Sequence, residues 1–186
     1  MSLPAMAGLI DDDVLNAFAV VADRWTLLRD SGTPDTLPAS GAVIVPLAAW
    51  TAHRDALATR GDVGVWLAPA DDPATLAADV AALPLIAVDF PQFTDGRGYS
   101  IARLLRERFG FTGELRAIGD IQRDQLYYLA QCGFDAFELP DGRSADDALA
   151  GLSVFTDGYQ LTHARIPWFR RRDTAVGSGE FRFPSE

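Results

Sequence analysis

The sequence has few of the residues that disulfides and metal centres require. Its 186 residues include one cysteine, Cys132, and two histidines that lie far apart, His53 and His163. One thiol cannot form an internal disulfide or hold an iron–sulfur cluster, and no His/Cys pair has the spacing of a zinc site. The sequence also lacks a flavin or nicotinamide fingerprint. We therefore expect no metal and no bound cofactor.

Basic residues and long apolar runs are scarce as well. The chain has 16 Lys and Arg against 26 Asp and Glu, which gives a net charge of −10. This charge argues against binding to nucleic acid or to an anionic membrane surface. No stretch approaches the roughly 18 apolar residues of a membrane span, and the first residues lack a basic leader. We expect a cytoplasmic protein whose acidic side chains keep it soluble.

The sequence predicts alternating strands and helices, and the alternation becomes regular from residue 43 onward. Strands are predicted at residues 25–28, 43–45, 63–67, 85–88, 115–118 and 136–139. Helices are predicted at residues 14–22, 47–60, 100–109 and 123–132, with further helix starts at Asp72 (as N-cap before Pro73) and at Ser144, which forms a capping-box pattern with Asp147. Gly133 is placed to end the helix before it.

Strands that alternate with helices predict parallel pairing and right-handed crossovers. The chain is therefore expected to form an α/β fold of about five β-α units with a mainly parallel sheet, either an open doubly wound sheet or an incomplete TIM-like barrel. We divide it into a variable N-terminal segment (1–24), an α/β domain (25–160) and an irregular C-terminal tail (161–186).

Ligands of parallel α/β folds bind at the carboxyl ends of the strands, and the loop after the strand at 85–88, from Asp89 to Tyr99, has anion-binding features. Glycines at 96 and 98 permit close backbone approach, the helix expected at Ser100 offers free N–H groups, and Arg97 carries a planar cationic fork. The predicted oxyanion-binding residues are Thr94, Asp95, Gly96, Arg97, Gly98, Tyr99 and Ser100. The alternative is that Asp95 and Arg97 pair with each other and that the glycines only make a turn.

Carboxylates follow the same strand and the next one. Asp89, Asp95, Asp120 and Asp124 could meet at one end of the sheet, where they could bind a divalent ion or act as acid and base. Asp95, Asp120 and Asp124 are thus candidate catalytic residues. The alternative is that Asp120 or Asp124 caps the following helix and that Asp89 accepts turn hydrogen bonds. Cys132, at a helix C-terminus, is expected to be an inert thiol with a raised pKa.

Three segments carry a resemblance to a known family. They are residues 90–106 (FPQFTDGRGYSIARLLR), 113–120 (GELRAIGD) and 123–138 (RDQLYYLAQCGFDAFE). Over about Trp25 to Gln160, the chain resembles a bacterial family of unknown function whose members are labelled as probable oxidoreductases involved in sulfite reduction. The resemblance implies a role beside assimilatory sulfite reductase, but it supplies no agreed catalytic residues.

We consider three functions. The first is an accessory or small-ligand protein of assimilatory sulfite reduction that binds an oxyanion and contacts a sulfite reductase subunit. The second is an enzyme of that pathway, an oxidoreductase that uses the carboxylates near Asp95 and Asp120. The third is a purely structural partner of a larger reductase, which would use exposed apolar surface. Self-association into a homo-oligomer is compatible with each of them.

Overall fold

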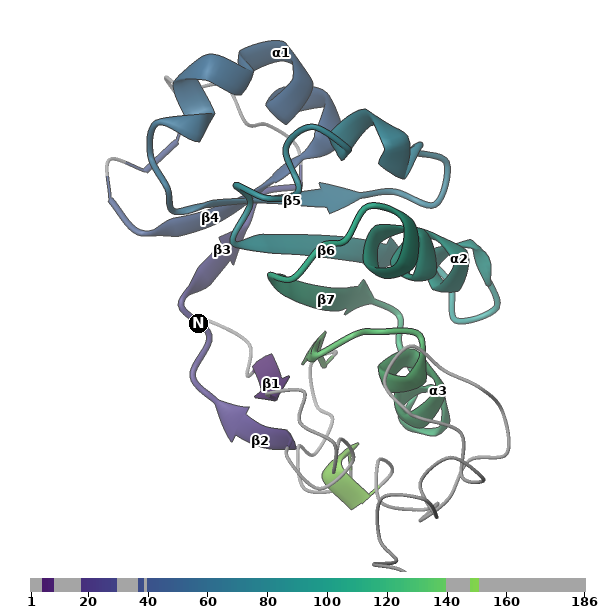
Figure 1. Cartoon of the computed structure of the whole chain (residues 1–186). Coiled ribbons are helices and arrows are strands. Elements are labelled where there is room, and N and C mark those ends of the chain that lie inside the picture. Colours follow the sequence, from purple (N-terminus) through teal and green to yellow (C-terminus); the bar gives the residue numbers. More distant parts are fainter. Residues whose placement is uncertain (1–4, 9–17, 30–36, 39, 140–147, 151–186) are drawn as a thin grey trace, which may run out of the picture.

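The computed structural model describes residues 5–8, 18–29, 37–38, 40–139 and 148–150. Its strands form one sheet (Figure 1). The strands are β1 (Ala5–Gly8), β2 (Phe18–Val21), β3 (Trp25–Leu27), β4 (Ala42–Pro46), β5 (Val63–Leu67), β6 (Leu85–Phe90), β7 (Glu114–Gly119) and β8 (Ala136–Glu138). All six predicted strands are confirmed, and β6 extends two residues further than expected, so that it includes Asp89 and Phe90.

Helical segments connect the parallel strands. They are α1 (Leu47–Ala58), the 3₁₀ turn η2 (Pro73–Leu76), α2 (Arg97–Arg103) with its π-helical continuation η3 (Leu104–Arg108), and the 3₁₀ turn η4 (Arg123–Gln125) leading into α3 (Leu126–Gln131). Asp72 caps η2 as predicted, since its Oδ1 accepts a hydrogen bond from the Ala74 N–H at 2.9 Å. Among the described residues, none of these helices has the length and apolar character that a membrane crossing requires.

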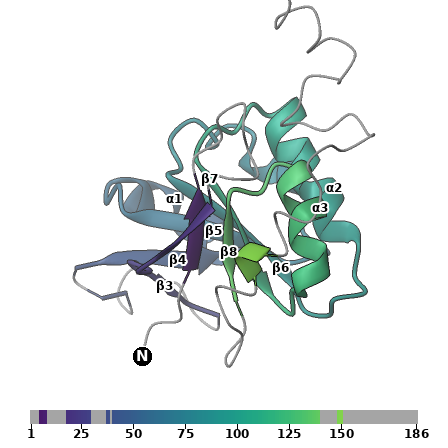
Figure 2. The same ribbon diagram turned by 90° about the horizontal axis from the view of Figure 1, so that it is seen from below.

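The order of the strands identifies the architecture. The sheet runs β2-β1-β8-β7-β6-β5-β4-β3, and every pair from β3 to β8 is parallel. A doubly wound sheet reverses its strand order, whereas here each right-handed crossover moves to the next strand in the same direction. All connecting helices therefore lie on one side (Figures 1 and 2). The fold is an incomplete TIM-like barrel, a half-barrel, to which β1 and β2 add an antiparallel pair.

A short link explains why the sheet curls. The two edge strands, β2 and β3, are joined by three residues, 22–24. In a flat sheet of eight strands the two edges would lie about 34 Å apart. The four residue steps from Val21 to Trp25 span at most about 14 Å. The sheet must curl until its edges approach each other, and the link then crosses the open side of the half-barrel (Figure 1).

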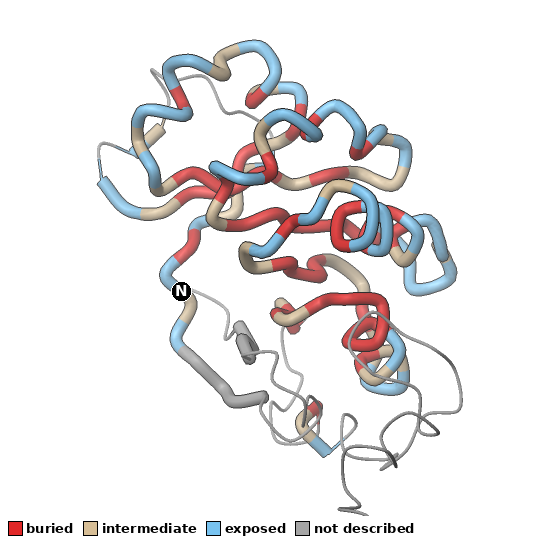
Figure 3. The backbone as a smooth tube through the Cα atoms, viewed as in Figure 1, coloured by how far each residue is buried: buried red, intermediate tan, exposed pale blue. Residues whose placement is uncertain are grey.

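The strands of the curled sheet are mostly buried (Figure 3), and each face of the sheet has its own core. The outer face packs against the helices through a large apolar cluster that includes Val45, Val65, Val88 and Phe137. The inner face buries a smaller cluster made of Trp25, Ile44, Leu85, Ala87 and Ile118. Since residues alternate between the faces along each strand, the same register places Asp89, Glu114, Arg116 and Glu138 on the inner side.

Some predicted elements differ from the structure. The helix expected at 14–22 is wrong in its second half, because Phe18–Val21 pairs with β1 as a strand, and residues 9–17 lie outside the described part. The helix expected from Ser100 begins earlier, at Arg97. The predicted helix start at Ser144 and Asp147 and the tail 161–186 lie outside the described residues.

Candidate functional site

The loop that follows β6 is fixed to the end of β7. The Asp120 N–H donates to the Phe90 carbonyl at 2.7 Å, and the Phe93 N–H donates to the Asp120 carboxylate at 3.3 Å. The Gln125 side chain donates to the Phe93 carbonyl at 2.7 Å. The predicted ligand loop and the loop after β7 are therefore joined at the carboxyl ends of two neighbouring strands, where this kind of fold binds ligands.

Asp95 and Arg97 pair with each other on this loop. The Arg97 Nε and Nη2 donate to the two Asp95 oxygens at 3.0 and 2.7 Å, and the Arg97 backbone N–H donates to Oδ1 at 3.1 Å. The hydrogen bonds from Arg97 hold the pKa of Asp95 below its ordinary value. This is the pairing that we considered as the alternative to ligand binding. The Arg97 side chain nevertheless keeps 62% of its surface exposed.

The two glycines of the loop have different structural roles. A Cβ atom at position 98 would lie 2.5 Å from the Phe90 ring, so Gly98 allows the start of α2 to pack directly on β6. A Cβ atom at position 96 would meet nothing within 4 Å. Gly98 is buried, so its absent side chain serves packing against Phe90.

The remaining residues of the predicted anion site are divided between surface and core. Thr94 and Ser100 are exposed. Tyr99 is half-buried, with its ring against Phe90 and Tyr128 at centroid distances of 5.4 and 5.1 Å, and burial raises the pKa of its hydroxyl. The structure therefore places Asp95 and Arg97 together at the surface and turns Tyr99 towards the core.

The carboxylates of the two loops do not form a shared centre. Asp120 accepts hydrogen bonds from Phe93 and from the Gln122 side chain, and Asp124 is exposed in the first turn of η4. Gln122, rather than either aspartate, is the N-cap, because its side chain and that of Gln125 form a reciprocal capping box. Within the described ranges, no group of three His, Cys, Asp or Glu side chains could hold a metal ion.

A set of charged residues on the inner face was not predicted as a site from the sequence. Arg116, whose side chain is 3% exposed, pairs with Asp23 of the link and with Glu114, both at 2.7 Å. Among the described residues, Asp89 accepts no turn hydrogen bond; its Oδ1 pairs with Arg29 Nη1 at 3.0 Å. Arg116 lies within an otherwise apolar predicted strand, and that one charged position was the available signal.

Glu138 completes this group at the end of β8. Its side chain is partly buried, and desolvation raises the pKa of its carboxyl group. The charges that act on it are those of Arg116, Asp23, Arg29 and Asp89, which come from three separate parts of the chain. Only the curl of the sheet brings them together.

Part of the chain matches the model of a known protein family. The family described as bacterial proteins of unknown function (DUF934) matches residues 64–169, which is more than half of the 186 residues. The chain belongs to this family. No curated protein matches it. The matched range of this chain includes Asp89, Arg97, Arg116 and Glu138.

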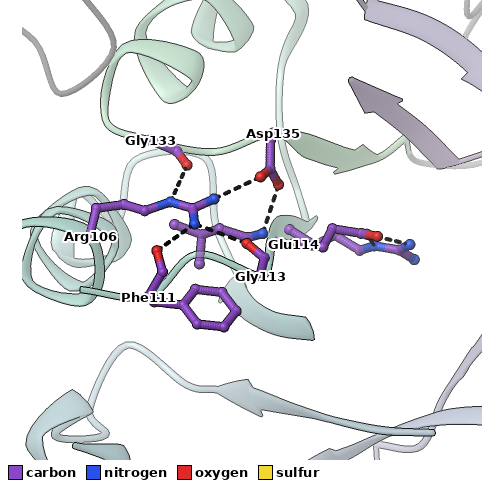
Figure 4. A network of polar contacts seen from close by, with 8 residues as sticks. Arg106, Phe111, Gly113, Glu114, Gly133 and Asp135 are labelled. Atoms are coloured by element: carbon purple, nitrogen blue, oxygen red, sulfur yellow. Dashed lines mark hydrogen bonds and ion pairs between the residues drawn. The ribbon is translucent and has the colours of Figure 1, made fainter. Parts of the chain in front are cut away.

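The amino ends of the strands in this family member carry a buried polar network (Figure 4). Arg106 donates to the carbonyls of Phe111, Gly113 and Gly133 at 2.7–2.9 Å and pairs with Asp135 at 2.7 Å. Burial raises the pKa of Asp135 to about 6, although Arg106 and the Leu115 N–H act in the opposite direction. This network lies at the end of the half-barrel that typically serves stability, so we assign it a structural role.

Cys132 ends α3 and is buried. Burial raises the pKa of its thiol by desolvating the thiolate, which confirms the expected direction. A buried, protonated thiol is a poor nucleophile, so Cys132 packs as an apolar side chain.

Proposed function

We propose that this chain is an accessory protein of assimilatory sulfite reduction that binds a small oxyanion. One observation carries the binding part of the proposal: the exposed Arg97 guanidinium lies on a loop that Asp120 and Gln125 hold in place at the carboxyl ends of β6 and β7. The pathway is inferred from the resemblance of residues 90–106, 113–120 and 123–138 to proteins associated with sulfite reductase.

The chemistry of the loop supports an anion as the ligand. All 16 basic residues of the chain are arginines, and the loop presents one of them in a chain of net charge −10. Asp95 occupies Nε and one Nη2 hydrogen of Arg97, which leaves Nη1 for a ligand. Exposed ion pairs are weak because water screens them, so Asp95 can yield to a doubly charged anion.

Three variants test the binding. Calorimetric titration with sulfite, sulfate and phosphate is expected to show binding to the wild type and a loss of about ten- to a hundredfold in Arg97→Ala, the range of one charge-assisted hydrogen bond. Asp95→Asn should bind more tightly than the wild type, since it removes the competing carboxylate. Arg103→Ala is the matched control, because Arg103 is an exposed arginine of the same helix that is also paired with a carboxylate. Equal binding by the wild type and Arg97→Ala would contradict the proposal.

The partner part of the proposal requires a separate experiment. Phe93, in the same loop, is 52% exposed, and a large exposed aromatic side chain is typical of a protein-binding surface. We expect purified sulfite reductase to bind the chain and Phe93→Ser to weaken this binding, as measured by biolayer interferometry. Tyr128→Ser, at another exposed aromatic residue, is the control. Absence of binding to the reductase would remove the proposed partner and leave the anion proposal intact.

The enzyme alternative has less support than the binding function. Asp95 is already paired with Arg97, and Asp120 already accepts two hydrogen bonds. Asp124 projects from a 3₁₀ turn at the surface. A general base needs a free oxygen within reach of a substrate proton, and these three carboxylates do not converge on one position.

A further inference from the structure

The exposed large apolar side chains of the described residues gather beside two neighbouring helices. They are Phe93 before α2, Leu104 at the start of η3 and Tyr128 in α3, with exposed fractions of 52%, 38% and 44%. The helices pack side by side, since the ring centroids of Tyr99 in α2 and Tyr128 lie 5.1 Å apart (Figure 2). Phe93 belongs to the loop that presents Arg97, whereas Leu104 and Tyr128 offer apolar surface on the helices themselves.

The first of these helices also concentrates positive charge in an acidic chain. Residues 97–108 contain four of the 16 arginines and one of the 26 acidic residues, whereas residues 61–83 of the preceding strand–helix unit contain four aspartates and no basic residue. Arg106 is buried, so Arg103 and Arg108 supply the exposed positive charge in the second half of the helix. Positive charge and apolar surface therefore occur on the same helix.

The two exposed arginines retain donors for a partner. Arg103 pairs with Glu107 at 3.2 Å, but the two side chains are 45% and 50% exposed, and water screens such a pair. Arg108 lies 5.8 Å from the centre of the Phe109 ring and pairs with no carboxylate among the described residues. Leu104 and Arg108 begin and end η3, which places them about one π-helical turn apart on the same side. The exposed leucine is thus accompanied by two guanidinium groups that can accept new carboxylate partners.

The charges select the class of partner. A second copy docked through the same face would bring Arg103 and Arg108 against their equivalents, and like charges across an interface are unfavourable. Nucleic acid would leave Leu104 and Tyr128 in water and would be repelled by a chain of net charge −10. Arginine and aromatic side chains are enriched in protein–protein interfaces. We propose that Arg103, Leu104, Arg108 and Tyr128, which we call the α2–α3 face, dock an acidic segment of another protein. Its carboxylates would pair with the arginines, and its apolar side chains would cover Leu104 and Tyr128.

The probe is a fluorescent helical peptide in which glutamates flank leucines. Two matched peptides carry glutamine in place of glutamate or alanine in place of leucine. Fluorescence anisotropy is expected to show that the first peptide binds about fivefold or more tightly than either matched peptide, and that added salt weakens its binding. Leu104→Ser and Arg108→Glu should each weaken binding about fivefold or more. Arg24→Glu is the control, because it makes the same charge change at an exposed arginine of the link, which crosses the open side of the half-barrel.

The outcomes separate the α2–α3 face from the loop and from other occupants. Phe93→Ser and Arg97→Ala should leave peptide binding unchanged. Equal binding of the glutamate and glutamine peptides, or equal binding by the wild type and Arg108→Glu, would overturn the proposal. Tighter binding of a labelled single-stranded DNA than of the peptide would also overturn it, as would a dimer in light scattering that Leu104→Ser abolishes. Both substituted side chains are exposed, so circular dichroism should show that the variants keep the fold.

Discussion

Gly96 and Gly98 stand two positions apart in one loop, yet substitution should affect them differently. Gly98→Ala puts a methyl group 2.5 Å from the Phe90 ring and should lower the free energy of unfolding by about 1–3 kcal/mol through overpacking. Gly96 has φ −79° and open space around it, so Gly96→Ala should change the free energy by no more than about 0.5 kcal/mol. Urea unfolding measures both. Equal effects of the two substitutions would show that Gly98 does not support the contact with β6.

At the same scale, one local sequence pattern is compatible with two different roles of the same residues. Gly98 was selected because glycine permits a ligand to approach, and the structure shows that it permits a phenylalanine ring to approach. Both demands require the same missing Cβ atom, so a local pattern cannot separate them. Arg97 and Asp95 were likewise expected either to bind an anion or to pair, and the structure contains the pair.

At the scale of elements, the change from α2 to the π-helical turn η3 brings Arg106 to the amino ends of β7 and β8. Arg106→Met should lower the free energy of unfolding by about 3–5 kcal/mol, because it leaves buried Asp135 and three carbonyls without their donor. Arg103→Met, on the exposed side of the same helix, should cost no more than about 0.5 kcal/mol. Urea unfolding of both variants is the measurement, and a small cost for Arg106→Met would contradict its role as the connection between helix and strands.

For the whole molecule, two largely buried carboxyl groups predict an unusual dependence of stability on pH. The folded state holds the proton of Asp135 more tightly than the unfolded chain does, since its pKa is raised from 3.8 to about 6. Its contribution is therefore most favourable below pH about 4 and is lost as the pH rises through about 6. The difference between the two pKa values corresponds to a change of about 3 kcal/mol in the free energy of unfolding. The pKa of Glu138 is also raised, so its titration changes the stability in the same direction.

Urea unfolding at pH 5, 6 and 7 should accordingly give a free energy of unfolding that increases as the pH falls from 7 to 5. Asp135→Asn should flatten this dependence, because it removes the main titrating group. The lowered pKa of Asp95 acts in the opposite direction, but that carboxyl group is exposed and contributes little. A stability that falls between pH 7 and pH 5 would contradict this account.

Much of the fold was determined by the sequence alone. The mainly apolar runs at 43–45, 63–67, 85–88, 115–118 and 136–139 are strands whose residues are buried apart from the partly buried Trp66 and Glu138, and their alternation with helical periodicity predicted a parallel α/β sheet. Local signals also placed the Asp72 cap and the helix end at Gly133, whose φ is +104°. These features depend on neighbouring residues, whose identity and spacing the sequence states directly.

The tertiary structure decided which way the crossovers move and therefore which residues meet. The choice between an open sheet and a half-barrel depends on the order of the strands in the sheet. Each strand–helix unit has the same sequence pattern in both folds, so the sequence does not show that order. β2 was predicted as part of a helix because its pairing with β1 has no local signal. Asp23, Arg29, Asp89, Arg116 and Glu138 are spread over 116 positions, and they share one inner face only because a three-residue link forces the sheet to curl.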